Sequence, residues 1–199
     1  GISLMQTADA WLQKINDMLS RMSELAVNAN DGTKTSEDIS NIQSEFSQLQ
    51  DEIVRITSRS SAAAKFNGLY LFRGKSGRAA ATGDTIIDGS ISIQIGADSD
   101  QKIGLNLANL EITNTEVIGT VSAYTYNTDN TVNTETHTPV TWASIVDSNT
   151  MTITMSGVIG KIAQAINHVS NTRAKLGAQQ TRMGQTRGGL LSYEDNLRM

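Results

Sequence analysis

The chain begins GISLMQTADAWLQKINDMLSRMSELAVNAN, residues 1–30, and this stretch decides the fold class. Its apolar residues follow one another in alternating steps of three and four, which is the repeat of a long helix with one apolar side. Such a seam must be covered by other helices. We therefore expect a helix over residues 1–29 that packs against partners within the chain. The seam consists of Met5, Ala8, Leu12, Ile15, Leu19, Met22 and Ala26.

Two further segments carry the same repeat. The turn residues Asn30-Asp31-Gly32, which tolerate a left-handed backbone, separate the first helix from the second. The second helix should begin at Thr35-Ser36-Glu37-Asp38, where the Thr35 hydroxyl and the Asp38 carboxylate can satisfy free backbone N–H groups. A turn this short predicts that the two helices are antiparallel neighbours. The second seam is Ile39, Ile42, Phe46, Leu49, Ile53 and Ile56.

The third helix is expected from Met155 to Leu197. Its seam is apolar as far as Val169 and mixed after Leu176. Arg173 falls on this seam, which indicates incomplete burial there or a missing partner. The first part of the seam is Met155, Ile159, Ile162, Ile166, Val169, Arg173 and Leu176.

Between the second and third helices the apolar period changes from helical to alternating. The alternation predicts a β-hairpin with its turn at residues 96–100 and one apolar face, which we expect the first two helices to cover. Its alternating apolar residues are Ile91, Ile93, Ile95, Ile103, Leu105 and Leu107.

Threonine and asparagine dominate residues 113–154, which offer few positions for a core. We expect a small, polar, solvent-facing insertion with short strands around Val117–Tyr126 and Thr150–Met155. The predicted fold class is mainly α with a β-hairpin (α+β): an elongated antiparallel helical rod of three long helices plus a small β-containing variable insertion. Residues 1–112 would form the N-terminal part of the rod domain, residues 113–154 the outer insertion, and residues 155–199 the C-terminal rod helix.

Composition supports a rod and excludes several classes of function. Only 5% of the 199 residues are aromatic, which is low for a compact core but sufficient for long packed helices. The net charge of −4 gives no basic surface for nucleic acid. The chain has no cysteine, so disulfides and thiolate chemistry are excluded. No apolar run reaches the length needed to span a membrane.

Catalytic, metal and cofactor sites are not expected. His137 and His168 each lack a second histidine three or four residues away, and a surface histidine is the simpler interpretation. Asp98 and Asp100 are too few carboxylates for a calcium loop. The carboxylates of the second helix, Glu37, Asp38, Asp51 and Glu52, have no nucleophile beside them and indicate a solvated face.

The order of helix, helix, hairpin, polar insertion and returning helix resembles bacterial flagellin, and individual motifs do so too. Leu19–Asn30 (LSRMSELAVNAN) is similar to the family's most recognisable motif. Phe66-Asn67-Gly68 resembles the turn after its second rod helix, Ile93–Ala97 its hairpin, and Arg173–Ala178 its C-terminal rod helix. The resemblance covers roughly residues 1–110 and 155–199.

The resemblance implies a secreted structural subunit of the extracellular bacterial flagellum that assembles with other flagellin subunits through long helical surfaces and supports motility. It also implies recognition by a flagellin-sensing Toll-like receptor. The positions that match the family's contact surface are Arg21, Leu25 and Glu45. Arg21 and Leu25 are four residues apart and so share a helical side, while Arg21 lies off the seam and should be exposed. The alternative is an ordinary solvated face with one packed leucine.

Other interpretations remain open. Flagellins carry further helices at both ends that this sequence lacks, so we expect a fragment of a longer chain. The hook–filament junction protein, a close relative, shares the terminal pattern, although the motifs at Leu19–Asn30 and Arg173–Ala178 favour flagellin. A helical adhesin or binding module, whose polar insertion contacts carbohydrate or a host surface, is the alternative from another functional class.

Overall fold

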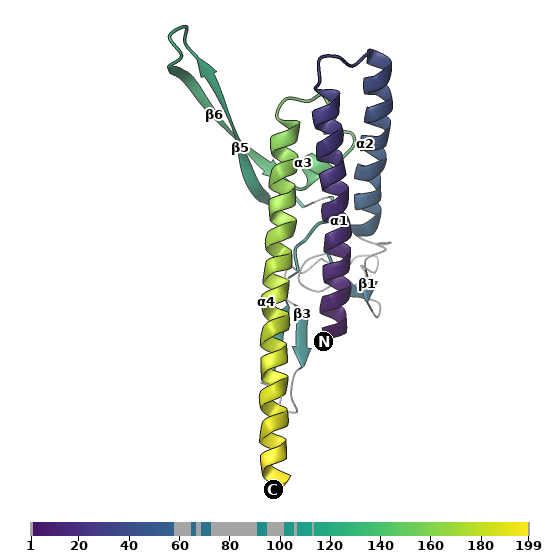
Figure 1. The fold of residues 1–199 in the computed structure, drawn as a ribbon, viewed down its shortest axis with the longest axis vertical. Helices are drawn as coiled ribbons and strands as arrows, with labels where there is room; N and C mark the ends of the chain where they lie inside the picture. Colours follow the sequence, from purple (N-terminus) through teal and green to yellow (C-terminus); the bar gives the residue numbers. More distant parts are fainter. Residues whose placement is uncertain are drawn as a thin grey trace.

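A computed structural model describes residues 2–57, 65–66, 69–72, 91–94, 102–105, 107–112 and 114–198. Three long helices, α1, α2 and α4, lie side by side, and α4 extends well beyond the first residues of α1 (Figure 1). The helices are α1 (Ile2–Ala29), α2 (Ser36–Thr57), α3 (Ala143–Val146) and α4 (Val158–Arg198).

The described strands form three separate antiparallel pairs. The pairs are β1 (Lys65–Phe66) with β2 (Leu69–Tyr70), β3 (Ile91–Gln94) with β4 (Lys102–Leu105), and β5 (Val117–Tyr126) with β6 (Val132–Thr141). The chain is thus helix-rich with small two-stranded sheets, in agreement with the predicted class.

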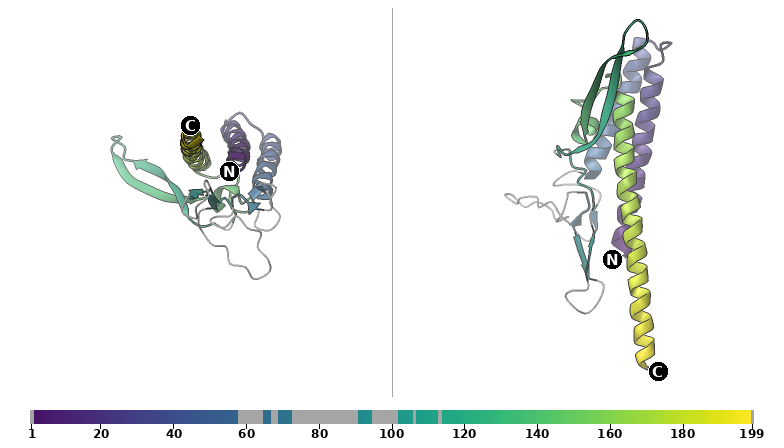
Figure 2. Two further views of the ribbon diagram at one scale, coloured as in Figure 1. Left: turned by 90° about the horizontal axis from the view of Figure 1, so that it is seen from below. Right: turned by 90° about the vertical axis from the view of Figure 1, so that its left-hand side faces the viewer.

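The apolar seam of α1 forms the centre of the core. All seven of its predicted residues, from Met5 to Ala26, have an exposed fraction of 0%. α1 contacts both α4 and α2, and the view along the helices places it between them (Figure 2). Burial of this whole stripe fixes the rotation of α1 about its own axis, because turning the helix would expose the stripe to water.

The predicted start of α2 is confirmed. The Asp38 backbone N–H donates to the Thr35 hydroxyl (3.1 Å), and the Thr35 backbone N–H donates to the Asp38 carboxylate (3.2 Å). These bonds favour the ionised carboxylate and lower the pKa of Asp38, the backbone donor being the larger cause. The preceding turn forms without a left-handed residue, since the described residues with positive φ are Asn130 and Gly157.

The seam predicted for the third helix is partly wrong. α4 begins at Val158 rather than Met155, and Met155 and Ile159 are 36% and 40% exposed. Three of the seven predicted positions, Ile162, Val169 and Leu176, are buried. Between them the buried side is displaced by one residue, to the small side chains Ala165 and Thr172. The buried side of α4 consists of Val158, Ile162, Ala165, Val169, Thr172 and Leu176.

The predicted β-hairpin around residues 91–105 is confirmed for the residues that the structure describes. Its register pairs Ile91 with Leu105 and Gln94 with Lys102. Among the helices, α4 makes the largest contact with β4, so the returning helix takes part in covering this hairpin, which we expected the first two helices to cover. The predicted turn at 96–100 and Ile95 lie outside the described residues.

The polar insertion is only partly as predicted. Strand β5 has the expected bounds, but its partner is Val132–Thr141, and residues 150–155 form turns. The β5–β6 hairpin projects away from the helices (Figure 1). The residues after it are not solvent-facing, because Trp142, Ile145 and Ile153 are at most 1% exposed and join the helical core.

Candidate contact surface

The structure brings together two of the three residues singled out from the sequence. The Arg21 guanidinium on α1 donates from Nε to Oε1 of Glu45 at 3.0 Å and from Nη2 to Oε2 at 3.3 Å, which ties α1 to α2 through a two-pronged ion pair. Its Nη1 also donates to Glu24 Oε2 at 3.2 Å. The hydrogen bond to Glu45 is the main cause that raises the pKa of Arg21.

This ion pair lies at the surface. The side chains of Arg21 and Glu45 are 48% and 45% exposed. Exposed pairs contribute little to stability, typically less than about 1 kcal/mol, because water screens them and ordering the side chains costs entropy. The pair therefore orients charged groups toward the outside and adds little to the core.

Leu25 does not lie on the exposed surface. It is on the same side of α1 as Arg21 in the helical repeat, but it is only 3% exposed and belongs to the hydrophobic core. The expectation that Arg21 and Leu25 form one accessible face therefore needs correction. Leu25 therefore contributes to the core and not to an exposed face.

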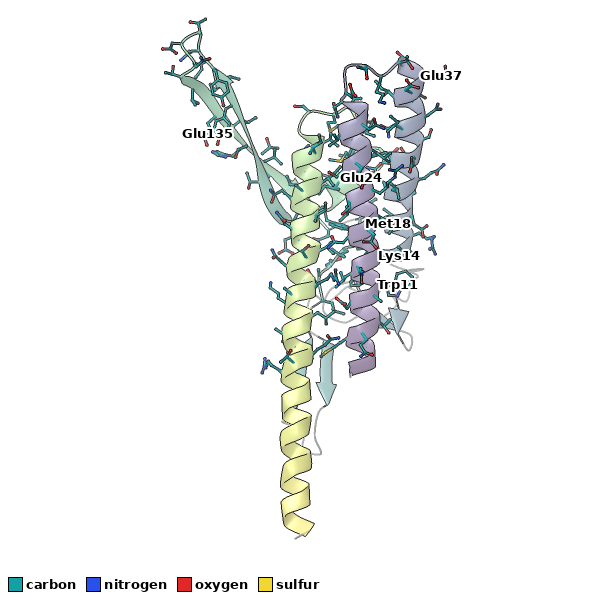
Figure 3. The ribbon with its side chains drawn as sticks, in the orientation of Figure 1. Trp11, Lys14, Met18, Glu24, Glu37 and Glu135 are labelled. Atoms are coloured by element: carbon teal, nitrogen blue, oxygen red, sulfur yellow. The ribbon has the colours of Figure 1, made fainter. Side chains whose placement is uncertain are left out.

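Sequence reasoning missed several residues that extend this surface along α1. Trp11 and Met18 are half-buried against the core. The Lys14 ammonium lies 5.3 Å from the centroid of the Trp11 ring, within the range of a cation–π contact. Figure 3 shows Trp11, Lys14, Met18 and Glu24 in succession along one side of α1. The signal was available, because steps of three and four connect these positions to Arg21.

We define this α1–α2 surface as the ridge. Its residues are Trp11, Lys14, Met18, Arg21, Glu24 and Glu45. It combines an aromatic ring, a thioether and charges of both signs on two helices that are fixed to each other. Aromatic, methionine and arginine side chains are enriched at protein–protein interfaces.

On the other side of α1, Arg173 finds a partner that the sequence alone did not identify. Its Nε donates to Asp9 Oδ1 at 3.0 Å, and the two side chains are 34% and 38% exposed. The prediction that burial is incomplete at Arg173 is confirmed. The pair joins α1 to α4 through a half-exposed ionic contact.

The two histidines have separate structural environments. The His168 ring lies 6.3 Å from the buried Trp142 ring, and burial is the main cause that lowers the pKa of His168. On the β5–β6 hairpin, Ser122 Oγ lies 2.9 Å from His137 Nδ1, and Glu135 Oε1 lies 3.0 Å from His137 Nε2. These three groups are exposed to water and link the two strands of the hairpin.

Within the described residues, no group of three or more His, Asp or Glu side chains could hold a metal ion. Asp98 and Asp100 lie outside them. In that same part of the chain, no helix is both long and apolar enough to cross a membrane.

Comparison with known proteins finds similarity to bacterial flagellins. Residues 1–77 match the family model of the bacterial flagellin N-terminal helical region. The chain is 33% identical over 197 residues to flagellin FlaB1 of Treponema pallidum (strain Nichols), which covers 99% of this chain and 59% of that protein. It is also 33% identical over 202 residues to the flagellin of Bacillus subtilis (strain 168), covering 99% of this chain and 62% of that flagellin.

The chain is a relative of the bacterial flagellins. The matched relatives are named as flagellins and as flagellar filament core proteins. It spans about three-fifths of the length of the curated flagellins that it matches.

Solved structures show the same fold. The crystal structure of Bacillus cereus flagellin superposes with a TM-score of 0.62 at 22% identity, over 94% of this chain and 84% of that one. Xanthomonas campestris FlgL superposes with a TM-score of 0.63 at 18% identity, over 98% of this chain and 91% of that one. The arrangement of helices and small antiparallel sheets is thus that of flagellin.

Proposed function

We propose that this chain is the helical part of a flagellar filament subunit and that it supports motility as part of an extracellular polymer. The observation that carries the proposal is its similarity to flagellins along 99% of its length. The three long helices would act as a rod that packs lengthwise against rods of identical subunits. Contacts of this kind repeat without closing and so build a helical filament.

We further propose that the rod and the insertion have different tasks. Residues 1–112 and 142–199 would form the rod, because the apolar residues after β6 are buried in the helical core, and the β5–β6 hairpin would form the outer part. The division is supported by burial, since 12 consecutive residues from Ser122 to Asn133 are exposed. Assembly would then depend on the rod and not on the hairpin.

Deletion of the hairpin tests this division in the full-length protein that carries this chain. Residues 122–138 are replaced by a two-residue turn, which keeps the base of the hairpin. A filament subunit should still assemble, as seen by sedimentation and electron microscopy. An adhesin or binding module would keep its folded helices but lose binding to its ligand, and loss of assembly with the helices intact would contradict the proposal.

The ridge is our candidate for contact with neighbouring subunits and with a Toll-like receptor that senses flagellin. Arg21 and Glu45 would carry the direct contact, and Leu25 would support them from beneath. Support comes from the side-chain types and from the fixed geometry of the Arg21–Glu45 pair on two helices. Charged groups held in this way give specificity at an interface.

The receptor contact is tested with Arg21→Ala and Leu25→Ala in receptor-binding and thermal-unfolding measurements. Arg21→Ala should weaken binding with little change in stability, because the side chain is exposed. Leu25→Ala should cost about 2–5 kcal/mol of stability, as for other buried leucines. Ser20→Ala, at a neighbouring exposed position, is the control. Wild-type receptor affinity in Arg21→Ala would remove the ridge as the receptor surface.

A further inference from the structure

Residues 142–153, which we call the strap, connect the β5–β6 hairpin to α4. The strap contains α3, which contacts α2, β6 and α4. Its apolar side chains are buried between these elements although the sequence around them is polar. The buried side chains of the strap are Trp142, Ile145, Val146, Met151 and Ile153.

Two glutamines of α2 hold the strap by its backbone. Gln50 Nε2 donates to the carbonyl oxygens of Ile145 (2.8 Å) and Met151 (3.3 Å). Gln43 Oε1 accepts from the Ile153 backbone N–H at 2.7 Å. The two glutamines are seven residues apart, two helical turns, and therefore face the strap from the same side of α2.

A buried glutamine at position 50 lowers the stability of the fold unless its amide group makes hydrogen bonds. Its exposed fraction is 0%, and its Oε1 has no hydrogen-bond partner within the described residues. An apolar side chain would avoid that unpaired oxygen but would leave two strap carbonyls without their donor. Packing alone would favour an apolar residue at position 50. The Gln50 amide is therefore explained by its hydrogen bonds to the strap backbone.

The base of the hairpin rests directly on α4. A Cβ atom built on Gly119 of β5 would lie 2.3 Å from Gln164 Oε1, so a larger residue at 119 would displace that side chain. Val121 lies against the glycines at the start of α4, 3.4 Å from a Cβ built on Gly160. The hairpin is therefore attached at two places. The first is the contact of Gly119 and Val121 with α4, which we call the seat, and the second is the strap, which continues from β6.

We propose that Gln43 and Gln50 form a latch that fixes the direction of the β5–β6 hairpin through the strap, and that this latch opens independently of the helices. The seat on α4 lets the hairpin pivot, and the latched strap prevents the pivot. The hydrogen bonds of Gln43 and Gln50 run to the strap and to Ser47 of α2, and α1 packs on α4 directly, so we expect α1 and α4 to stay packed when the strap is released. This inference does not depend on the proposed filament function.

Hydrogen exchange in Gln50 variants tests whether the latch opens separately. Gln50→Met keeps the volume but removes the donor, and Gln50→Glu places a carboxylate against the two carbonyls. Backbone amides of the strap should exchange roughly tenfold faster or more, while those of Leu12–Met22 in α1 should keep their wild-type rates. Gln48→Glu, exposed on the same helix, is the matched control and should change neither.

The direction of the hairpin is measured with two spin labels on introduced cysteines, which is straightforward because the chain has no cysteine. Ser20→Cys on α1 and Thr128→Cys near the hairpin tip are both exposed. The distance distribution should be narrow in the otherwise wild-type chain and in Gln48→Glu, and broad in Gln50→Glu. Gln43→Leu, which loses one hydrogen bond to the strap and one to Ser47 within α2, should give intermediate broadening.

Two results would overturn the proposal. The first is an unchanged distance distribution together with unchanged strap exchange in both Gln50 variants. The second is faster exchange of α1 in step with the strap, including complete unfolding of a variant, which would make the strap part of one cooperative core.

Discussion

At the scale of single residues, the stability of the molecule depends on side chains that satisfy backbone groups. Thr35 and Asp38 show this at the start of α2, where each accepts from the other's backbone N–H. This pair could be predicted from the sequence, because the capping box is local and involves residues only three apart. The Gln43 and Gln50 bonds could not, since their backbone partners lie about a hundred residues away in the chain.

The helix cap gives the first prediction at this scale. Thr35→Ala removes the acceptor for the Asp38 N–H and should lower the free energy of unfolding by about 1 kcal/mol. Ser40→Ala, at an exposed position within α2, is the control and should leave stability close to wild type. Urea unfolding followed by circular dichroism measures both, and equal midpoints for the two variants would show that the cap contributes nothing.

His168 gives a prediction for the pH dependence of stability. Burial near Trp142 lowers the pKa of His168, while Glu116 partly opposes this shift and Lys175 adds to it. The unfolded chain, in which the pKa is near 6.5, therefore binds a proton more readily. Stability should be full above that value and fall as the pH drops below it, by at most about 1.4 kcal/mol per pH unit.

The free energy of unfolding is measured at one pH above and one pH below 6.5, the ordinary histidine pKa. Both pH values stay well above the range in which carboxylates titrate. His168→Gln should remove much of the difference seen in the wild type. His137→Gln, on the exposed hairpin, should retain it. A wild-type difference that survives in His168→Gln would assign the pH dependence to another group.

At the scale of the elements, the two ends of the chain differ in how well the sequence predicted them. The seam of α1 was fully predicted, because large apolar residues occupy nearly every seam position. On α4 the buried side includes the small residues Ala165 and Thr172, while the larger Ile159 is exposed and Ile166 is only partly buried against the core. A pattern based on hydrophobicity alone selects the larger side chains. At every second position, the predicted seam of α4 therefore names the residue next to the one that is buried.

This correction has a direct test. Ala165 is fully buried and Ala163, two positions away on α4, is exposed. Ala165→Leu should overpack the α1–α4 contact and destabilise by about 1–3 kcal/mol. Ala163→Leu should be tolerated, and thermal unfolding compares the two. The opposite ranking would mean that α4 is rotated relative to the described structure.

The insertion shows the other limit of sequence reasoning at this scale. Strand β6 lies in a run of threonines and polar residues with no apolar alternation, because both faces of the hairpin are exposed there. Without a buried face there is no periodic signal to detect. Trp142 and Ile145, by contrast, are apolar residues in a polar neighbourhood, and their burial follows from a fold-back that only the tertiary structure shows.

At the scale of the whole molecule, α1 connects the two roles that we assign to the chain. One side of α1 carries the seam that packs against α4, and the side next to α2 carries the ridge. The seam can be read from the repeat of three and four residues, whereas Arg21 and Glu45 were singled out by the resemblance to flagellin. The sequence left open whether Leu25 is exposed or packed, because its burial depends on the tertiary arrangement.

The most direct test of the central claim is a chimera of the Bacillus subtilis flagellin, to which this chain is 33% identical over 202 residues. The matching segment of that flagellin is replaced by this chain, and filaments on cells lacking their own flagellin are examined by electron microscopy. We predict filaments built from the chimera. A chimera that is secreted and folded, but remains monomeric without filaments, would contradict the account.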